Sequence, residues 1–236
     1  MFTISSDSSR ARRWIAAGMG KDENHARQSS KVRKVMTKNA AALLFFALLA
    51  APSFGALQQG EMAPDFKAQA SLAGKEFTFS LHDALKKGPV VVYFYPAAFT
   101  GGCNLQAHTF AENHDKFAAA GASVVGVSLD NIGRLDEFSS DPQYCAGKLP
   151  VASDENGAIA KSYGVNVSDN YKGQAIAKMK NTRGDEIGHS IADRTTFVVA
   201  SDGKIVATIG GLGGDANAEQ ALAVVQQIAA KGHTTH

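Results

Sequence analysis

Beyond residue 88, the apolar residues fall into short continuous runs separated by mixed segments. Residues 90–95 (VVVYFY) form one run, bounded by Pro89 and Pro96, and residues 122–129 (ASVVGVSL) form another. Continuous β-branched and aromatic runs of this length are typical of strands buried on both faces. The pattern therefore predicts two central strands at these positions.

Segments with apolar residues at helical spacing alternate with these strands. They are residues 103–120, closed by Gly121, residues 132–138, residues 154–163, closed by Gly164, and residues 216–231. Residues 195–200 and 204–209 flank Ser-Asp-Gly at 201–203, which predicts a β-hairpin. This order predicts an α/β fold with one central mixed sheet: strand, helix, strand and helix, followed by a hairpin and a closing helix.

Two connecting stretches carry no chemical signal. Residues 166–193, rich in Lys and Gly, are interpreted as an insertion with a small hairpin. Residues 210–214 (GGLGG) follow a strand but lack the spacing and the following Lys of a phosphate-binding loop. We therefore interpret 210–214 as a flexible connector.

The N-terminal part of the chain resembles a targeting signal. Lys38 and the basic residues before it precede an apolar run at 40–51, which ends at Pro52 and the small residue Gly55. This layout predicts a secretory signal peptide cleaved after Gly55 or Ala56. At about 12 residues the run is shorter than the roughly 20 that span a bilayer.

We therefore expect three segments. Residues 36–55 are the signal peptide, and residues 56–236 are the folded domain. Residues 1–35 are polar, Ser- and Arg-rich and without apolar periodicity. They are either a non-native extension of the reading frame ahead of a true start at Met36, or an unusually long basic leader. Removal of the signal would leave a periplasmic protein with no membrane anchor.

Composition and charge exclude several classes of protein. The hydrophobic fraction is 44% and the charged fraction 19%, so the chain can bury a core and is not disordered. Residues 1–55 hold 9 of the 24 Lys and Arg but only 3 of the 22 Asp and Glu. The rest of the chain is mildly acidic, which argues against nucleic-acid binding. Two cysteines exclude a disulfide scaffold and a four-cysteine zinc site.

Cys103 occupies a chemically special position. The first buried run is followed by PAAFTGGC, so Cys103 lies in the first turn of the helix expected over 103–120. Unpaired N–H groups and the positive end of the helix dipole stabilise an anion there, which favours a reactive thiolate. Gly101 and Gly102 would let a small substrate approach the backbone amides. The alternative is an unreactive cysteine buried under the sheet.

The spacing Pro96-(x)3-Thr100-(x)2-Cys103 resembles the active-site motif of the peroxiredoxins. Three further segments resemble the family in the same order: residues 60–66 (GEMAPDF), 149–154 (LPVASD) and 194–197 (RTTF). The resemblance implies a thioredoxin-like three-layer sandwich with a central mixed β-sheet. Within the family the chain is most similar to the monomeric bacterioferritin-comigratory, or Q-type, branch, which implies a monomer.

Carried over to this chain, the resemblance implies four roles. Cys103 would be the peroxidatic cysteine, Thr100 would hydrogen-bond the peroxide, and Pro96 would shield the pocket from water. Arg194 would hold the thiolate and the peroxide, although a surface salt bridge with Asp193 is its alternative outside the family context. The branch usually has Pro in place of Gly101 and Glu in place of Gln106, departures that affect helix entry and the orientation of Arg194.

Cys145 lies in a stretch with loop signals, between Asp141-Pro142 and Gly147. Two cysteines in an exported protein usually form a structural disulfide. A sulfenic acid on Cys103 would instead need a partner thiol. The resemblance implies that Cys145 is this resolving cysteine, through a transient disulfide. Some relatives place the resolving cysteine five residues after the peroxidatic one, where this chain has His108.

The sequence thus predicts a periplasmic thiol peroxidase that reduces hydrogen peroxide or small organic hydroperoxides. The resemblance implies that it needs no metal and no organic cofactor and that a thioredoxin-like protein supplies the electrons. The histidines show no metal-binding pattern. Two alternatives remain open. One is a non-enzymatic thioredoxin-fold binding module with a permanent disulfide between Cys103 and Cys145, and the other is a redox sensor that uses the same bond.

Overall fold

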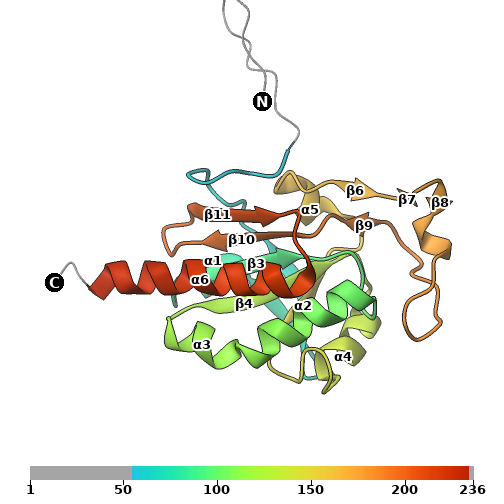
Figure 1. The fold of residues 1–236 in the computed structure, drawn as a ribbon, viewed down its shortest axis with the longest axis horizontal. Coiled ribbons are helices and arrows are strands. Elements are labelled where there is room, and N and C mark those ends of the chain that lie inside the picture. The colour runs from blue at the N-terminus through green and yellow to red at the C-terminus, as the bar shows by residue number, and fades with distance from the viewer. Residues whose placement is uncertain (1–54, 234–236) are drawn as a thin grey trace, which may run out of the picture. The chain divides into compact units, whose positions relative to one another are not determined.

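The computed structural model describes residues 55–233 (Figure 1). The expected N-terminal extension and all but the last residue of the expected signal peptide lie outside the described residues, so both stay predictions. Among residues 55–233 no helix has the length and apolar character needed to cross a membrane.

The centre of the fold is a mixed sheet of seven strands in the order β11-β10-β3-β4-β5-β1-β2. β3 runs parallel to β4, and β4 runs parallel to β5, whereas β10 pairs with β3 and β11 in antiparallel fashion. The β1–β2 hairpin adds an antiparallel edge next to β5. The strands are β1 (Lys67–Leu72), β2 (Lys75–Ser80), β3 (Val90–Phe94), β4 (Ser123–Ser128), β5 (Val151–Ser153), β10 (Thr195–Val199) and β11 (Ile205–Gly210). The expected central mixed sheet and the expected hairpin of β10 and β11 are confirmed.

Helices cover both faces of this sheet (Figure 1). They are α1 (Leu81–Leu85), α2 (Gly101–Glu112), α3 (His114–Ala119), α4 (Ile132–Ser140), α5 (Ala158–Ser162) and α6 (Gly214–His233). Successive residues of β3 face opposite sides, as the pleat requires. Val91 and Tyr93 pack with residues of α2, α3, α4 and α6, while Val90, Val92 and Phe94 pack with residues of α1 and α5. The result is the expected three-layer arrangement.

The helix expected over 103–120 is two helices. α2 begins two residues earlier, at Gly101, and ends at Glu112. Asn113 leaves the helical region at φ −93 and ψ 6, and its side-chain amide donates to the carbonyl of Thr109 at 2.8 Å. Asparagine competes for backbone hydrogen bonds in this way, which explains the break before α3. The hairpin β1–β2 and α1 were not predicted, because residues 67–85 carry only short and partly exposed apolar patterns.

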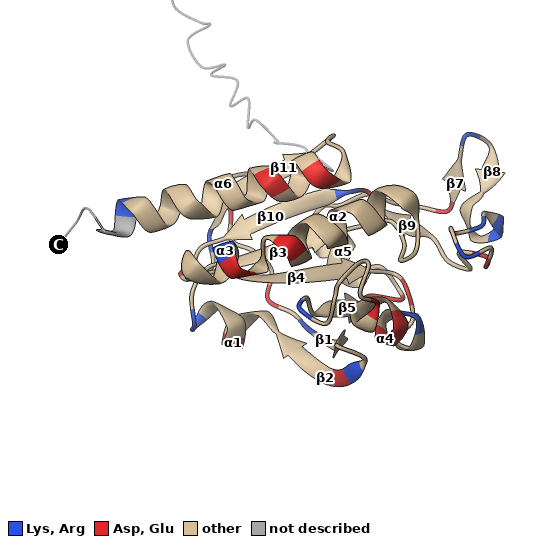
Figure 2. Ribbon diagram, turned by 60° about the horizontal axis from the view of Figure 1, so that its bottom comes forward, with Lys and Arg blue, Asp and Glu red and all other residues tan. Residues whose placement is uncertain are grey.

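Residues 166–193 form a lobe beside the sheet. β7 (Asn170–Tyr171) and β8 (Gln174–Ala175) make the small hairpin that was expected. β6 (Val167–Ser168) pairs with β9 (Ile191–Ala192), and the 3-10 helix η1 (Ile176–Lys178) lies between the two pairs. Lys and Arg occur repeatedly along the segment after β7 (Figure 2). The loop that follows η1 returns to the centre of the fold, where it contacts the segment before Cys103.

Candidate active site

Cys103 lies in the first turn of α2, as predicted, and only 2% of it is exposed. Its N–H donates to the carbonyl of Thr100 at 2.9 Å. Gly101 and Gly102 are exposed, and their N–H groups, in the first turn, have no carbonyl acceptor within the helix. The sulfur is therefore covered by protein but stands beside the positive end of a helix, where an anion is stabilised.

Arg194, immediately before β10, reaches this sulfur. Its Nη2 donates to Cys103 Sγ at 3.5 Å, and its Nη1 donates to Gln106 Oε1 through a short hydrogen bond. A Cβ atom on Gly102 would lie 3.1 Å from Nη2, so Gly102 leaves room for the guanidinium. The carboxylate of Asp193 accepts a hydrogen bond from Asn166 at 3.2 Å, whereas the guanidinium of Arg194 contacts Cys103. The structure thus brings Arg194 and Cys103 together.

Thr100 and Pro96 lie on the loop that joins β3 to α2. Both are half-buried. The Thr100 hydroxyl donates to the carbonyl of Ala97 at 2.8 Å and makes no cap hydrogen bond to the helix. Because its proton is committed to Ala97, the Thr100 oxygen keeps its lone pairs available to accept a hydrogen bond from a ligand.

Cys145 lies in the turn after α4, as expected, and is fully buried. Both cysteines are free thiols. Burial raises the pKa of the Cys145 thiol, and the negative charge of Asp141 raises it further. In this conformation Cys145 is a neutral thiol.

Aromatic rings fill the space around the two cysteines. The ring of Phe99 packs edge-on against Phe138 and Tyr144, with centroid separations of 5.1 and 5.9 Å. Tyr93 is buried in the same core cluster, and its hydroxyl has no hydrogen-bond partner among the described residues. Burial holds the pKa of the Tyr93 hydroxyl well above its usual range.

The lobe at 166–193 contacts the same loop, a contact that was not predicted from the sequence. Thr182 donates to the carbonyl of Phe99 from both its N–H and its hydroxyl, each at 2.8 Å. The guanidinium of Arg183 lies 3.4 Å from the centroid of the Phe99 ring. Arg183 also pairs with Glu137 at 2.8 Å and with Asp141 at 2.9 Å. One side chain therefore connects the loop before Cys103 to the turn that carries Cys145.

A buried carboxylate holds the other side of this loop. Asp130 accepts from the N–H of Ala98 at 2.7 Å and contacts His189 Nε2 at 2.9 Å and Arg134 Nη1 at 3.3 Å. Burial alone would raise the pKa of Asp130, but its hydrogen bond and charge interaction with His189 outweigh burial and lower it. For His189, burial acts to lower the pKa, but the hydrogen bond that its Nε2–H donates to Asp130 and the negative charge of Asp130 overcome this and raise it.

The sequence carried one usable signal for this carboxylate. Asp130 directly follows the buried run at 122–129, and the carboxyl ends of neighbouring parallel strands meet at one edge of a sheet.

Within residues 55–233 no group of three or more His, Cys, Asp or Glu side chains is placed to hold a metal ion. His108 and His114 are partly exposed and pair with Glu112 and Asp115.

Comparisons with known proteins agree with this geometry. The AhpC/TSA family profile matches residues 59–208, which include the loop before α2, Cys103, Cys145 and Arg194. A peroxiredoxin-class protein of Mycobacterium tuberculosis is 33% identical over 145 residues, covering 61% of this chain and 82% of that protein. Chloroplastic peroxiredoxin Q of Oryza sativa subsp. japonica is 39% identical over 113 residues, and the match spans 47% of this chain and 48% of the rice protein.

Solved structures show the same fold. The crystal structure of peroxidoxin BcpB from Mycobacterium tuberculosis matches with a TM-score of 0.59 and 29% identity, over 73% of this chain and 98% of that one. Peroxiredoxin Q from Xanthomonas campestris matches with a TM-score of 0.53 and 25% identity, over 68% and 90% of the two chains. The expected thioredoxin-like architecture is confirmed by these matches.

Proposed function

This chain belongs to the AhpC/TSA family of peroxiredoxins and is a thiol-dependent peroxidase, and from that premise we propose which of its residues carry the reaction. Cys103 is the nucleophile that attacks the hydroperoxide. The observation that carries this assignment is the Arg194 guanidinium donating to Cys103 Sγ at 3.5 Å, at the amino end of α2. Two sources of positive potential there favour the thiolate.

In the first step the thiolate attacks one oxygen of the hydroperoxide. The O–O bond breaks, Cys103 becomes a sulfenic acid, and the departing oxygen takes a proton to leave as water or an alcohol. Thr100 accepts a hydrogen bond from the bound hydroperoxide, Arg194 stabilises the charge that develops on the departing oxygen, and Pro96 limits access of water.

In the second step the sulfur of Cys145 attacks the sulfenic sulfur. A disulfide between Cys103 and Cys145 forms, and water leaves. Both sulfurs are buried in the described conformation, and the Cys145 pKa is raised there, so we propose that the turn after α4 and the first turn of α2 open before this step. Opening exposes Cys145 to water and brings the two Cα atoms within the roughly 7 Å that a disulfide requires.

In the third step an external dithiol reduces the disulfide by thiol–disulfide exchange and restores both thiols. We propose a thioredoxin-like protein as this reductant, hydrogen peroxide or a small organic hydroperoxide as the substrate, and a monomer as the working form. The likeness to the Q-type relatives supports these finer assignments.

Two cysteine variants test the assignment. Cys103→Ser should not react with hydrogen peroxide. Cys145→Ser should still be oxidised once, to a sulfenic acid, but should not turn over with a dithiol reductant. If Cys145→Ser turned over at the wild-type rate, its role as the resolving cysteine would be wrong. If wild-type oxidation took minutes in place of seconds, the assignment of Cys103 as the peroxidatic cysteine would be wrong.

We further propose that the protein is exported. The apolar run at 40–51 between basic residues and Pro52 supports a signal peptide, and export would place the peroxidase in the periplasm. N-terminal sequencing of the protein recovered from the periplasmic fraction tests this. The proposal predicts a mature chain that begins at Ala56 or Leu57. A chain that retains residues 36–55 and stays with the cytosolic fraction would contradict it.

A further inference from the structure

A network of buried and partly buried hydrogen bonds leads from α6 to the sulfur of Cys103. Asn217, in the first turns of α6, is fully buried. Its Nδ2 donates to the carbonyl of Ile209 at 3.2 Å, while its Oδ1 accepts from Gln106 Nε2 at 2.9 Å. The Thr196 hydroxyl donates to the same Oδ1. Gln106 in turn accepts from Arg194, which donates to Cys103 Sγ.

The hydrogen bond from Asn217 to the carbonyl of Ile209 fixes which atom donates and which accepts in every other bond of this network. A backbone carbonyl can only accept, so the Asn217 atom that faces Ile209 must be the amide nitrogen. The amide oxygen of Asn217 then faces Gln106, which must present its own nitrogen. Only then does the oxygen of Gln106 face Arg194. A flipped Gln106 amide would place N–H groups against the guanidinium, where donor would meet donor.

We propose that Asn217 is a positioning residue for the peroxidase reaction, because it fixes the orientation of the Gln106 amide and through it the position of Arg194 on Cys103. The inference rests on the proposed role of Cys103. Neither Asn217 nor Gln106 carries a charge, so the network aligns the guanidinium without neutralising it. The positive charge remains available to the thiolate, although Gln106 stands where related proteins usually have Glu.

The packing of α6 on α2 places Asn217 at this position. A Cβ atom on Gly214 would lie 2.2 Å from the carbonyl oxygen of Gly102 and 2.9 Å from the Cβ of Gln106. Only glycine permits this approach. The end of the stretch 210–214, expected to be a flexible connector, is therefore a fixed contact between the two helices, and it sets how near Asn217 comes to Gln106.

Asn217→Leu tests the proposal, with Thr196→Val as the matched control. Leucine has a similar size but cannot donate or accept, so Gln106 loses the partner that fixes its amide. Valine removes a different hydrogen bond to the same Asn217 oxygen and leaves the bonds to Ile209 and Gln106 in place. Asn217→Ser serves as a second variant if the leucine variant does not fold, since a serine hydroxyl is too short to reach Gln106.

Two readouts on the full chain separate positioning from simple stability. The first is the pH midpoint of thiolate formation at Cys103, followed by ultraviolet absorbance in a Cys145→Ser background, where no second thiol ionises. The second is the second-order rate constant for oxidation by hydrogen peroxide. The titration needs no peroxide, so it tests the hydrogen-bond chain even if the proposed reaction were wrong.

We expect Asn217→Leu to raise the midpoint by about one pH unit, which corresponds to about tenfold less thiolate below the midpoint. The oxidation rate constant should fall by about tenfold, while Thr196→Val changes either readout less than about twofold. Equal midpoints in wild type and both Asn217 variants would overturn the proposal. An equal shift in Thr196→Val would also overturn it, because the effect would then follow any loss of packing in this core.

Discussion

Arg183 holds together two segments that must separate during the proposed cycle. Its guanidinium lies on the ring of Phe99, in the loop before Cys103, and pairs with Glu137 and Asp141 at the start of the turn that carries Cys145. If the second step requires opening of this region, Arg183 opposes it. Arg183→Met keeps the length and apolar body of the side chain but removes its charge and its hydrogen bonds.

The size of the effect follows from these contacts. Ion pairs on the protein surface are worth about 0.2–1 kcal/mol each, and a cation–π contact at an exposed site adds about 0.5–1 kcal/mol. The side chains of Arg183 and Glu137 are 36% and 67% exposed, which places their pair at the lower end, whereas Asp141 is only 17% exposed. The three contacts together are worth about 1–2 kcal/mol, so their loss should favour the open form by about 5–30-fold.

The assay follows the protein after one equivalent of hydrogen peroxide. Rapid acid quenching and intact mass separate the sulfenic acid from the disulfide. We expect Arg183→Met to convert the sulfenic acid to the disulfide about 5–30 times faster than wild type, with little change in the first oxidation step. Excess peroxide should also over-oxidise Cys103 to the sulfinic acid less often, because the sulfenic acid persists for a shorter time.

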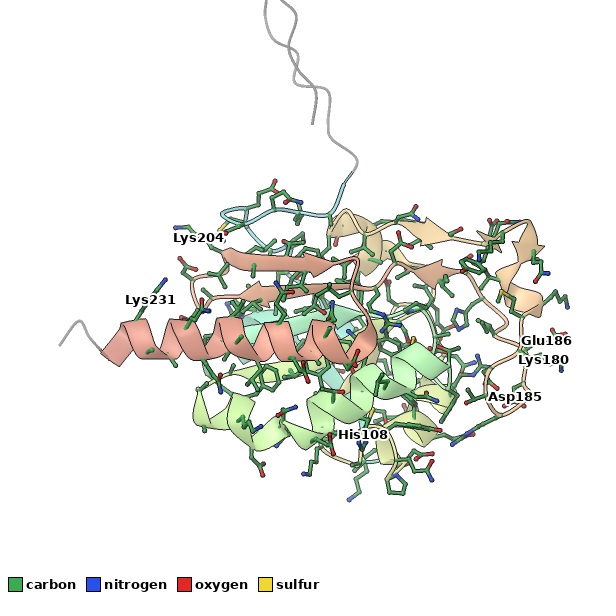
Figure 3. All side chains as sticks on the ribbon, viewed as in Figure 1. His108, Lys180, Asp185, Glu186, Lys204 and Lys231 are labelled. Carbon is green, nitrogen blue, oxygen red and sulfur yellow. The ribbon has the colours of Figure 1, made fainter. Side chains whose placement is uncertain are left out.

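Lys180→Met is the matched control. Lys180 belongs to the same lobe and is exposed at its outer edge, near Asp185 and Glu186 (Figure 3). Among the residues that the structure describes, its ammonium donates only to the carbonyl of Gly184, at 2.9 Å. The control removes the same charge without touching Phe99 or α4. Disulfide formation at the wild-type rate in Arg183→Met, or equal acceleration in both variants, would refute the reasoning.

Three further predictions concern the residues around this site. Gly102→Ala should lower the peroxide oxidation rate about tenfold in stopped-flow kinetics, because its Cβ would press on Arg194, whereas Gly101→Ala, in open space, should raise unfolding stability by up to about 1 kcal/mol. Since the folded pKa of His189 is raised and that of Asp130 lowered, their mutual stabilisation is complete between about pH 4 and 6.5. It is lost as pH rises through the folded pKa of His189 or falls through that of Asp130. The free energy of unfolding in urea should therefore differ most between His189→Asn and wild type near pH 6. A difference that stays constant at all pH values would contradict this. Tyr93→Phe removes a buried hydroxyl that has no hydrogen-bond partner among residues 55–233, so the free energy of unfolding should stay unchanged or rise by up to about 1 kcal/mol. A fall of more than about 1 kcal/mol would mean that the hydroxyl is paired.

The central strands could be predicted because burial on both faces leaves a continuous apolar run. β3 (90–94) and β4 (123–128) fall within the runs at 90–95 and 122–129, and each strand end lies within one residue of the expected end. The position of Cys103 followed from the same pattern, since a helix follows the first run after a short loop. Only the family resemblance predicted that Arg194 lies beside Cys103. Hydrophobic periodicity predicts helices and strands, but it does not show which side chains from distant parts of the sequence come into contact.

The polar contacts around the site could not be predicted from the sequence. Thr182 and Arg183 are ordinary loop residues, and only the folded lobe brings them onto Phe99, more than 80 positions earlier in the chain. Asn217 lies on the buried face of a helix in which the apolar positions carried the signal. Long-range hydrogen bonds between neutral side chains leave no periodic trace, so the network behind Arg194 appears only in three dimensions.

The most direct test of the account is a single turnover of the reduced protein. One equivalent of hydrogen peroxide is added, and free thiols and intact mass are followed with time. The account predicts that two thiols and two hydrogen masses are lost within seconds, as Cys103 and Cys145 join. Loss of one thiol with the gain of one oxygen would remove Cys145 from the cycle. The absence of any reaction over minutes would contradict the assignment of Cys103 as the peroxidatic cysteine.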